Sequence, residues 1–492
     1  FLIMSASGLP AAISKLVSEK RAIGRPDLAH KIFRTAFMLA AVMGMVCMVA
    51  IILFARPITA AMGDSQVYLA LLTLSPTVFI VSMMAVIRGY FQGMQSSVPT
   101  AISQIVEQIF NAIFSVVLAH ALWNFAMSNY PDERFIYGAA GGTSGTGIGA
   151  LAGFMFIAAF YFLVRGDILR DVRRSRRANR KADDSEYSIA KIAKKIIATS
   201  FPIIAGTAVF SIVALIDATI VVNRLQMAGF DETRARQLFG QIVGKFNPIT
   251  NIPAAISSSL AIAVLPVIAE FHELKRYRDV NSKINTAFRT AMIMTTPIAF
   301  GLGILGPQIV AMLFRSHPEG GTLFVIGFSS IVFLAVTHVA TGALQAIGKI
   351  YVPVVAAICG AVAKIAINLI LIPIPAINVY GAIIGTTVCY LITSIINCIV
   401  LARQTKSRFD IMGIFIKPAA ASALMALGCY VVYNTIYYII PRNAISTLIS
   451  ILFGMVLYLA FMLLFKGIRE EEVLMLPSGK KLAALLKRFR LI

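Results

Sequence analysis

Charged side chains are scarce in this sequence. Asp, Glu, Lys and Arg make up 13% of its 492 residues, whereas 58% of the residues are hydrophobic. A soluble domain carries about 25% charged residues, so the polar surface is too small to cover a water-soluble globule of this length. The composition excludes a single-span receptor, a secreted disulfide-stabilised domain and a soluble nucleotide enzyme. It predicts a polytopic membrane protein.

Cysteine is also rare, and none of the cysteines forms a C-x-x-C pair. All of them lie inside apolar runs, which favours small core residues over disulfides or metal ligands. They are Cys47, Cys359, Cys389, Cys398 and Cys429.

Catalytic motifs are absent from the sequence. It contains no Walker A loop, no H-E-x-x-H, no G-x-S-x-G and no nucleotide-cofactor fingerprint. We therefore expect no enzyme activity, no bound cofactor and no metal site. Any transport must then run on the membrane potential, on the gradient of the substrate or on a coupling ion such as Na⁺ or H⁺.

A glycine-rich stretch at residues 138–153 resembles a phosphate-binding loop only superficially. It lacks the G-K-[ST] ending, and it begins an apolar run. Small residues at this density are typical of transmembrane helices that approach one another closely. We expect helix packing here and not nucleotide binding.

Apolar runs of about 20 residues recur along the whole chain, and a run of this length spans the hydrocarbon core as a helix. The pattern predicts an all-α bundle with one partial span, ending near Val17, and twelve full spans. The full spans are predicted at residues 32–54, 67–87, 100–122, 139–164, 192–222, 239–268, 287–313, 323–343, 352–372, 380–401, 411–440 and 444–465.

The loops between these spans differ in charge. When alternate loops are assigned to opposite sides, most of the 44 lysines and arginines fall on one side. Positive charge marks the cytoplasmic side, so the C-terminus is predicted to be cytoplasmic. The net charge of +22 then reflects topology and not a nucleic-acid partner. The partial first span would run inward, and we expect a preceding helix that brings the total to fourteen.

An internal repeat links the two halves of the sequence at a separation of about 250 residues. The motif Pro-Ala-Ala-Ile-Ser at residue 10 returns at residue 253, and matching motifs follow in the same order. The further pairs are Arg34 with Arg289, Pro57 with Pro307, Gly89 with Gly342, Pro99 with Pro353 and Tyr137 with Tyr380. Six spans separate the equivalent positions, which predicts two parallel-related six-helix lobes around a central cavity.

The repeat predicts five regions. We expect an N-terminal lobe at 1–164, without its first helix, and a basic cytoplasmic linker at 165–190. A C-terminal lobe follows at 191–402, and two additional transmembrane helices at 403–466. The tail at 467–492 has leucines at helical spacing among basic residues, which suits a helix on the inner leaflet or a plain solvated tail.

Ionisable residues inside apolar spans are the remaining candidates for function, because burying them in lipid is costly and they usually face an interior cavity. The candidate cations are Lys15, Arg88, Lys245 and Lys364, and the candidate carboxylates are Glu107 and Asp217. For Lys15 and Arg88, the sequence favours a snorkelling side chain or a helix-end ion pair over a role in the cavity. The excess of cations favours an anionic substrate such as a diphosphate, with the carboxylates holding these cations or binding a coupling ion.

Four stretches of the sequence carry a family resemblance. The sequence RGYFQGMQ at residues 88–95, followed by PTAISQIVEQ at 99–108, resembles the Gram-positive branch of the MurJ-type lipid II flippases and the stage V sporulation protein B group. SGLPAAISKLVSEK at 7–20 and the span with Lys245 and Asn251-Ile252-Pro253 resemble the same branch. These proteins belong to the multidrug/oligosaccharidyl-lipid/polysaccharide exporter superfamily.

The resemblance implies a monomeric protein of the bacterial cytoplasmic membrane. It implies translocation of an undecaprenyl-diphosphate-linked peptidoglycan precursor, lipid II, from the inner to the outer leaflet by alternating access. It also implies that the two C-terminal helices form a groove for the polyprenyl tail. The alternatives are a flippase for another polyprenyl-linked glycan (teichoic, capsular or spore-coat), a cation-coupled multidrug exporter and a non-transporting scaffold for cell-wall assembly.

Overall fold

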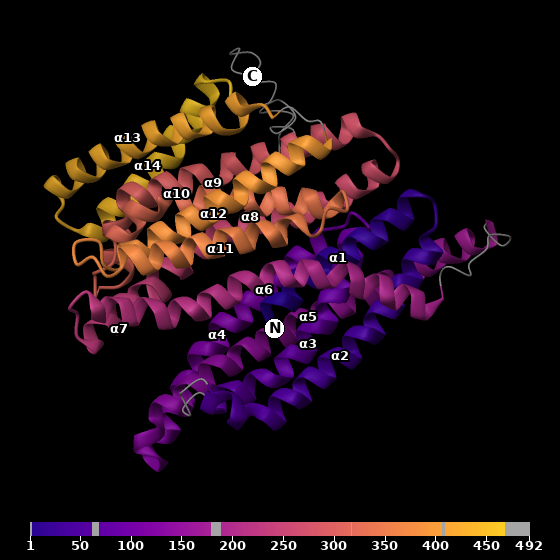
Figure 1. Cartoon of the computed structure of the whole chain (residues 1–492), viewed down its shortest axis with the longest axis horizontal. Helices are drawn as coiled ribbons and strands as arrows, with labels where there is room; N and C mark the ends of the chain where they lie inside the picture. Colours follow the sequence, from indigo (N-terminus) through magenta and orange to yellow (C-terminus); the bar gives the residue numbers. More distant parts are fainter. Residues whose placement is uncertain (1, 62–67, 179–187, 316, 406–408, 468–492) are drawn as a thin grey trace. The chain divides into compact units, whose positions relative to one another are not determined.

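A computed structural model describes residues 2–61, 68–178, 188–315, 317–405 and 409–467. All regular secondary structure in these ranges is helical, which confirms the all-α prediction. The helices are α1 (Leu2–Ala22), α2 (Pro26–Ala61), α3 (Tyr68–Gly93), α4 (Val98–Asn129), α5 (Arg134–Ala178), α6 (Ile189–Met227), α7 (Glu232–Gln241), α8 (Asn247–Glu273), α9 (Tyr277–Leu313), α10 (Thr322–Ala346), α11 (Val352–Leu371), α12 (Tyr380–Thr405), α13 (Lys417–Ile439) and α14 (Asn443–Leu464) (Figure 1).

The predicted spans coincide with these helices. Eleven of the described helical segments are long and apolar enough to cross a membrane. Helix α6 coincides with a twelfth predicted span and is 39 residues long. One span is assembled from two helices, because a five-residue π-helical turn at Ile242–Phe246 joins α7 to α8.

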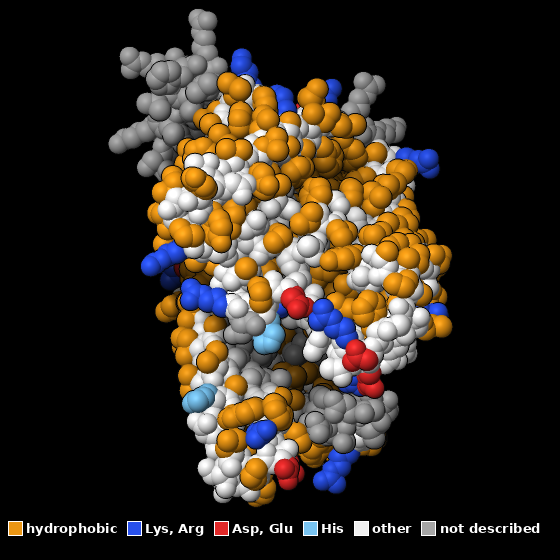
Figure 2. All heavy atoms as spheres, turned by 90° about the vertical axis from the view of Figure 1, so that its left-hand side faces the viewer, with side chains coloured by type: hydrophobic (Ala, Val, Ile, Leu, Met, Phe, Trp, Pro, Cys, Tyr) orange, Lys and Arg blue, Asp and Glu red, His pale blue; other side chains and the backbone are white. Residues whose placement is uncertain are grey.

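Large apolar side chains are exposed along the helices. Leu163 on α5 is 81% exposed and Val116 on α4 is 70% exposed. Figure 2 shows hydrophobic side chains spread over the face that it draws. A soluble protein rarely exposes so much contiguous apolar surface, whereas lipid chains solvate it without cost.

The internal repeat of the sequence is also present in the order of the helices. Pro99 and Pro353 each occupy the second position of a helix that starts with Val, in α4 and in α11. Proline is well tolerated in the first helical turn, where its missing N–H has no partner within the helix. The other motif pairs also fall on helices in matching order, so α1 to α5 correspond to α8 to α12.

The chain divides into two compact units. The first comprises Phe1–Ala208, Leu265–Arg276 and Gln345–Tyr351, and the second comprises Val209–Val264, Tyr277–Leu344 and Val352–Ile492. In the first unit, Tyr90 and Phe91 of α3 are buried in a core shared with α1, α2, α5 and α6. In the second unit one core centres on Phe246 and Phe324, and another joins α9 to α13 and α14.

The structure shows that two predictions from the sequence are wrong in part. Residues 165–178 of the predicted linker continue helix α5 and do not form an irregular connector; residues 179–187 and the predicted tail helix at 480–492 lie outside the described residues. All five cysteines are free. However, Cys359 is exposed on α11, so the core prediction is wrong for this residue. The predicted lobe boundaries stay a prediction.

Candidate functional site

Arg88 is the centre of a polar cluster in the first unit. Its guanidinium on α3 donates from Nε and Nη2 to Ser103 Oγ of α4, at 3.2 and 2.6 Å, and from Nη2 to Glu107 Oε2 at 2.9 Å. The Arg88 side chain is 7% exposed and that of Glu107 is 20% exposed. Ser103 in turn donates to the Gly153 carbonyl of α5 at 3.0 Å. The cluster therefore joins α3, α4 and α5.

Close packing of α5 against α4 makes this cluster possible. A Cβ on Gly149 would lie 2.6 Å from the Glu107 carbonyl, and one on Gly153 would lie 3.1 Å from Glu107 Cβ and the Ser103 carbonyl. Only glycine fits at such an approach. The glycine-rich stretch is thus a helix-packing surface, as the sequence predicted.

Glu107 belongs to a long polar face of α4. Asn111 Oδ1 accepts hydrogen bonds from Ser115 Oγ at 2.9 Å and from Thr146 Oγ1 of α5 at 3.3 Å. Ser103, Glu107, Asn111 and Ser115 follow one another at intervals of four residues, so they lie on one face of α4. This spacing was the sequence signal for Ser103 and Ser115, which we had not singled out.

Lys364 is the centre of a second cluster, in the second unit. Its ammonium on α11 forms an ion pair with Asp217 Oδ2 of α6. Asn368, one turn further along α11, donates to Asp217 Oδ1 at 2.9 Å. The side chains of Lys364 and Asp217 are 11% and 15% exposed. Gly385 of α12 leaves room for this cluster, because a Cβ there would lie 3.3 Å from Lys364 Cγ.

Lys15 is buried on α1 of the first unit. Its amine lies 4.0 Å from Glu19 Oε1, and Lys195 of α6 lies 3.9 Å from Glu19 Oε2. Two lysines therefore share one carboxylate. The side chain of Lys195 is 53% exposed and that of Lys15 only 9%.

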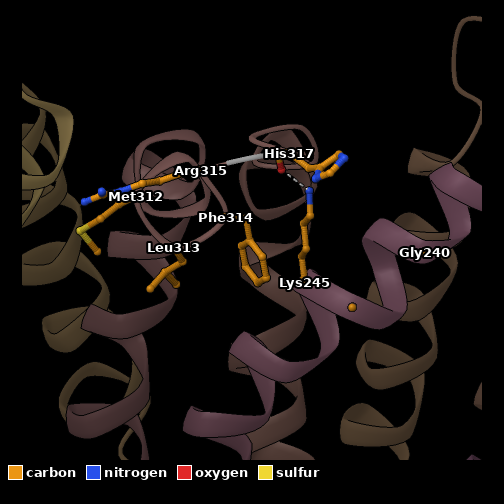
Figure 3. Close-up of a pocket in the computed structure, with 8 residues that line it drawn as sticks. Gly240, Lys245, Met312, Leu313, Phe314, Arg315 and His317 are labelled. Atoms are coloured by element: carbon orange, nitrogen blue, oxygen red, sulfur yellow. Dashed lines mark hydrogen bonds between the residues drawn. The ribbon is translucent and has the colours of Figure 1, made fainter. Parts of the chain in front are cut away.

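Lys245 belongs to neither ionic cluster. It belongs to the π-helical turn before α8, and its amine donates to the carbonyls of His317 and Glu319, at 2.6 and 2.7 Å, in the loop after α9. The residue is at the loop end of the span and not deep inside it. Figure 3 shows the amine directed at this loop with the Phe314 ring beside it.

A cavity of about 600 Å³ adjoins the Lys245 side chain. Its walls come from the π-helical turn and from the end of α9 with the following loop (Figure 3). The lining residues are Gly240, Gly244, Lys245, Met312, Leu313, Phe314, Arg315 and His317.

The structure thus separates the candidate residues into four places. It brings Arg88 to Glu107 and Lys364 to Asp217, and it leaves Lys15 and Lys245 in other surroundings. Removing one partner of a buried pair costs about 3–5 kcal/mol because the other charge stays buried. Each pair places a cation inside apolar helices, and such cations are the groups that pair with phosphate oxygens in proteins.

Comparison with models of protein families shows which family the chain belongs to. The family model described as polysaccharide biosynthesis protein matches residues 1–272, which is more than half of the chain. The chain belongs to this family. A second family model, MatE, matches residues 242–370 of the chain.

Relatives of this family member cover most of its length. It is 23% identical to the uncharacterized membrane protein YabM of Bacillus subtilis over 99% of this chain and 88% of that protein. It is 23% identical to the lipid II flippase MurJ of Bacillus subtilis over 84% of this chain and 76% of MurJ. It is 22% identical to stage V sporulation protein B of the same organism over 96% of this chain and 87% of that protein.

A solved structure agrees with the fold. An outward-facing multidrug resistance MATE family transporter of the MOP superfamily superposes with a TM-score of 0.63 at 14% identity, covering 82% of this chain and 84% of the transporter. This likeness shows the fold of the superfamily. Together with the eleven apolar helices, it identifies this family member as a multi-pass membrane protein.

Proposed function

We propose that this protein is a flippase for a polyprenyl-diphosphate-linked glycan, and that its substrate is the peptidoglycan precursor lipid II. The observation that carries the proposal is the pair of ionic clusters inside apolar helices, Arg88 with Glu107 and Lys364 with Asp217. A purely structural bundle gains little from such pairs, because apolar residues of the same volume stabilise as well. The similarity to the lipid II flippase MurJ supports the substrate class.

The clusters suggest how a diphosphate would bind. Arg88 presents a planar fork of N–H donors that fits two phosphate oxygens, and Glu107 occupies one branch of that fork. An incoming diphosphate would displace the carboxylate and keep the guanidinium charge compensated. Lys364 would make the equivalent exchange with Asp217, as a point charge and not as a fork. Neither exchange needs a cofactor or covalent chemistry, so the activity is transport and not catalysis.

The cellular setting follows from the same proposal. The protein acts in the bacterial cytoplasmic membrane as a monomer, with its C-terminus in the cytoplasm, and moves the lipid from the inner to the outer leaflet by alternating access. Its partners are the polyprenyl-linked lipid and the surrounding membrane lipids. Glu107 and Asp217 are the candidate sites for a coupling ion, Na⁺ or H⁺.

Complementation of a flippase-depleted bacterial strain tests the proposal. We expect Lys364→Ala and Lys245→Ala to abolish growth rescue while the protein is still present in the membrane. Lys283→Ala is the matched control, because this lysine is exposed on α9. Rescue by the wild type together with rescue by Lys364→Ala and Lys245→Ala would remove both lysines from the site.

A second measurement distinguishes the substrates. Native mass spectrometry of the purified protein with lipid II, in competition with undecaprenyl phosphate and a teichoic-type precursor, should show preferential retention of lipid II. Equal retention of all polyprenyl lipids would favour the second candidate, a flippase for another polyprenyl-linked glycan. The description of the matched family as polysaccharide biosynthesis protein is the observation that favours this candidate.

A further inference from the structure

A second cavity, open to the surface, lies in the same unit and shares Arg315 with the first. It has a volume of about 480 Å³, within the range of small-molecule sites. The end of α9, the loop after it and the hairpin between α13 and α14 form its walls. The lining residues are Pro307, Gln308, Ala311, Arg315, Pro318, Tyr433, Tyr437 and Asn443.

One wall of this cavity is held rigidly by hydrogen bonds. Asn443 Oδ1 accepts from the Tyr433 hydroxyl at 3.0 Å and from Thr447 Oγ1 at 3.2 Å, and Asn443 Nδ2 donates to the Gln308 carbonyl at 3.0 Å. These bonds connect α13, α14 and α9. Three hydrogen bonds therefore fix the Asn443 side chain in this wall, and a preformed wall needs little ordering when a ligand binds.

Two stacked tyrosines form the aromatic part of the cavity. Tyr433 and Tyr437, one turn apart on α13, have ring centroids 5.6 Å apart and ring planes inclined by 14°. Tyr433 is 8% exposed, whereas Tyr437 is 43% exposed. Tyr437 thus presents an accessible ring on a fixed support.

One polar side chain beside these rings is accessible to a ligand. Arg315 is exposed, and Figure 3 shows its side chain extending away from the Lys245 amine. Its planar guanidinium can bond two neighbouring hydroxyl groups at once. Gln308 also lines the cavity, but its Oε1 is buried and does not meet a ligand.

We propose that this cavity binds a sugar ring of a glycan. A pyranose has one face of C–H groups and a rim of hydroxyls, so its apolar face would pack on Tyr437 while its hydroxyl oxygens accept hydrogen bonds from Arg315. A lipid tail would make no hydrogen bond to Arg315, and an inorganic anion would leave the tyrosine ring unused.

The source of the sugar rests on the proposed function. The charge distribution of the loops assigns the α9–α10 loop and the α13–α14 hairpin to the outer side of the membrane. A glycan head group that had crossed the membrane would then reach this cavity. Substrates with the sugar would be retained longer on the outer side than the bare polyprenyl diphosphate.

Binding of a soluble disaccharide tests the cavity directly. The full chain in lipid nanodiscs is titrated with N,N′-diacetylchitobiose and followed by saturation-transfer NMR on the sugar signals. We expect Tyr437→Ala to weaken binding about tenfold, which corresponds to ~1.4 kcal/mol. Tyr437→Phe keeps the ring and should bind as the wild type does. Tyr438→Ala is the matched control, because Tyr438 is 91% exposed and does not line the cavity.

The outcomes separate this proposal from the proposed function. Absence of saturation transfer in the wild type, or equal binding by Tyr437→Ala and Tyr438→Ala, would overturn the sugar site even if lipid II is translocated. Selective loss in Tyr437→Ala supports the site even if no lipid is translocated. With lipid-linked ligands in native mass spectrometry, Tyr437→Ala should lower retention of lipid II and leave that of undecaprenyl diphosphate unchanged.

Discussion

At the residue scale, the two ionic clusters differ in how they hold their cation. Arg88 makes directed bonds to a hydroxyl and a carboxylate at once, whereas Lys364 makes an ion pair with Asp217, whose second oxygen is held by Asn368. The guanidinium is a planar fork of donors, whereas the ammonium is a compact point charge. The first cluster therefore suits a directed contact with two oxygens of an anion, and the second suits a contact with one.

Variants of the Lys364–Asp217 pair can separate its contribution to stability from its contribution to transport. We expect Lys364→Met to lower the free energy of unfolding by about 3–5 kcal/mol, because Asp217 stays buried without its cation. The double variant Lys364→Met/Asp217→Leu should recover most of this stability, since apolar pairs replace buried ion pairs well. If the Lys364 ammonium binds substrate, the double variant should still fail to transport it. Wild-type transport by the double variant would show that the pair is only structural.

The geometry of the Arg88 fork gives a separate prediction. Arg88→Lys keeps the positive charge but cannot reach Ser103 and Glu107 through one planar group. We expect transport to fall at least about tenfold, equivalent to ~1.4 kcal/mol of lost interaction, with the protein still folded in detergent. Arg174→Ala on the exposed part of α5 serves as control. Equal transport rates for Arg88→Lys and the wild type would rule out the fork as the recognition element.

At the element scale, the spacing between α4 and α5 decides where Glu107 lies. Four glycines at intervals of four residues, Gly141, Gly145, Gly149 and Gly153, face α4. Without side chains there, the two backbones approach closely and Ser103 reaches the Gly153 carbonyl. The π-helical turn before α8 has a comparable role, because it places Lys245 against the loop after α9.

Two single alanine substitutions on α5, compared with each other, test the role of this helix spacing. Gly149→Ala would place a Cβ 2.6 Å from the Glu107 carbonyl, so the helices must separate, at a cost of about 1–3 kcal/mol. Gly142→Ala meets no atom within 4 Å, and alanine favours a helix by about 0.5–1 kcal/mol. Thermal unfolding in detergent should show a lower midpoint for Gly149→Ala and an equal or higher one for Gly142→Ala. Equal midpoints would contradict close packing at Gly149.

At the scale of the whole molecule, the membrane potential acts on the charge that is moved. An inside-negative potential favours outward movement of an anion by about 2.3 kcal/mol per charge per 100 mV. We therefore expect proteoliposomes with a valinomycin-imposed potential to transfer fluorescent lipid II faster from the negative to the positive side. Vesicles without protein are the control. A rate that is independent of the potential would exclude potential as the driving force.

Much of this protein could be predicted from local sequence properties. Hydrophobic run length, loop charge and the repeated motifs depend on residues close together in the chain, and they predicted the helices, the α1–α5 to α8–α12 correspondence and the packing role of residues 138–153. They also singled out Arg88, Glu107, Asp217 and Lys364 as unusual, because a charge within an apolar run is visible without knowledge of the fold.

Only the tertiary structure decided which partners these residues have. Asp217 and Lys364 are 147 positions apart, and no periodicity relates two helices so distant in the sequence. The same reason explains why the partners of Lys245 could not be predicted: its carbonyl partners belong to a loop more than 70 positions away. The cavity of Arg315 and Tyr437 likewise exists only where α9 meets α13 and α14. Sequence patterns therefore determine the helices, whereas packing between helices determines the sites.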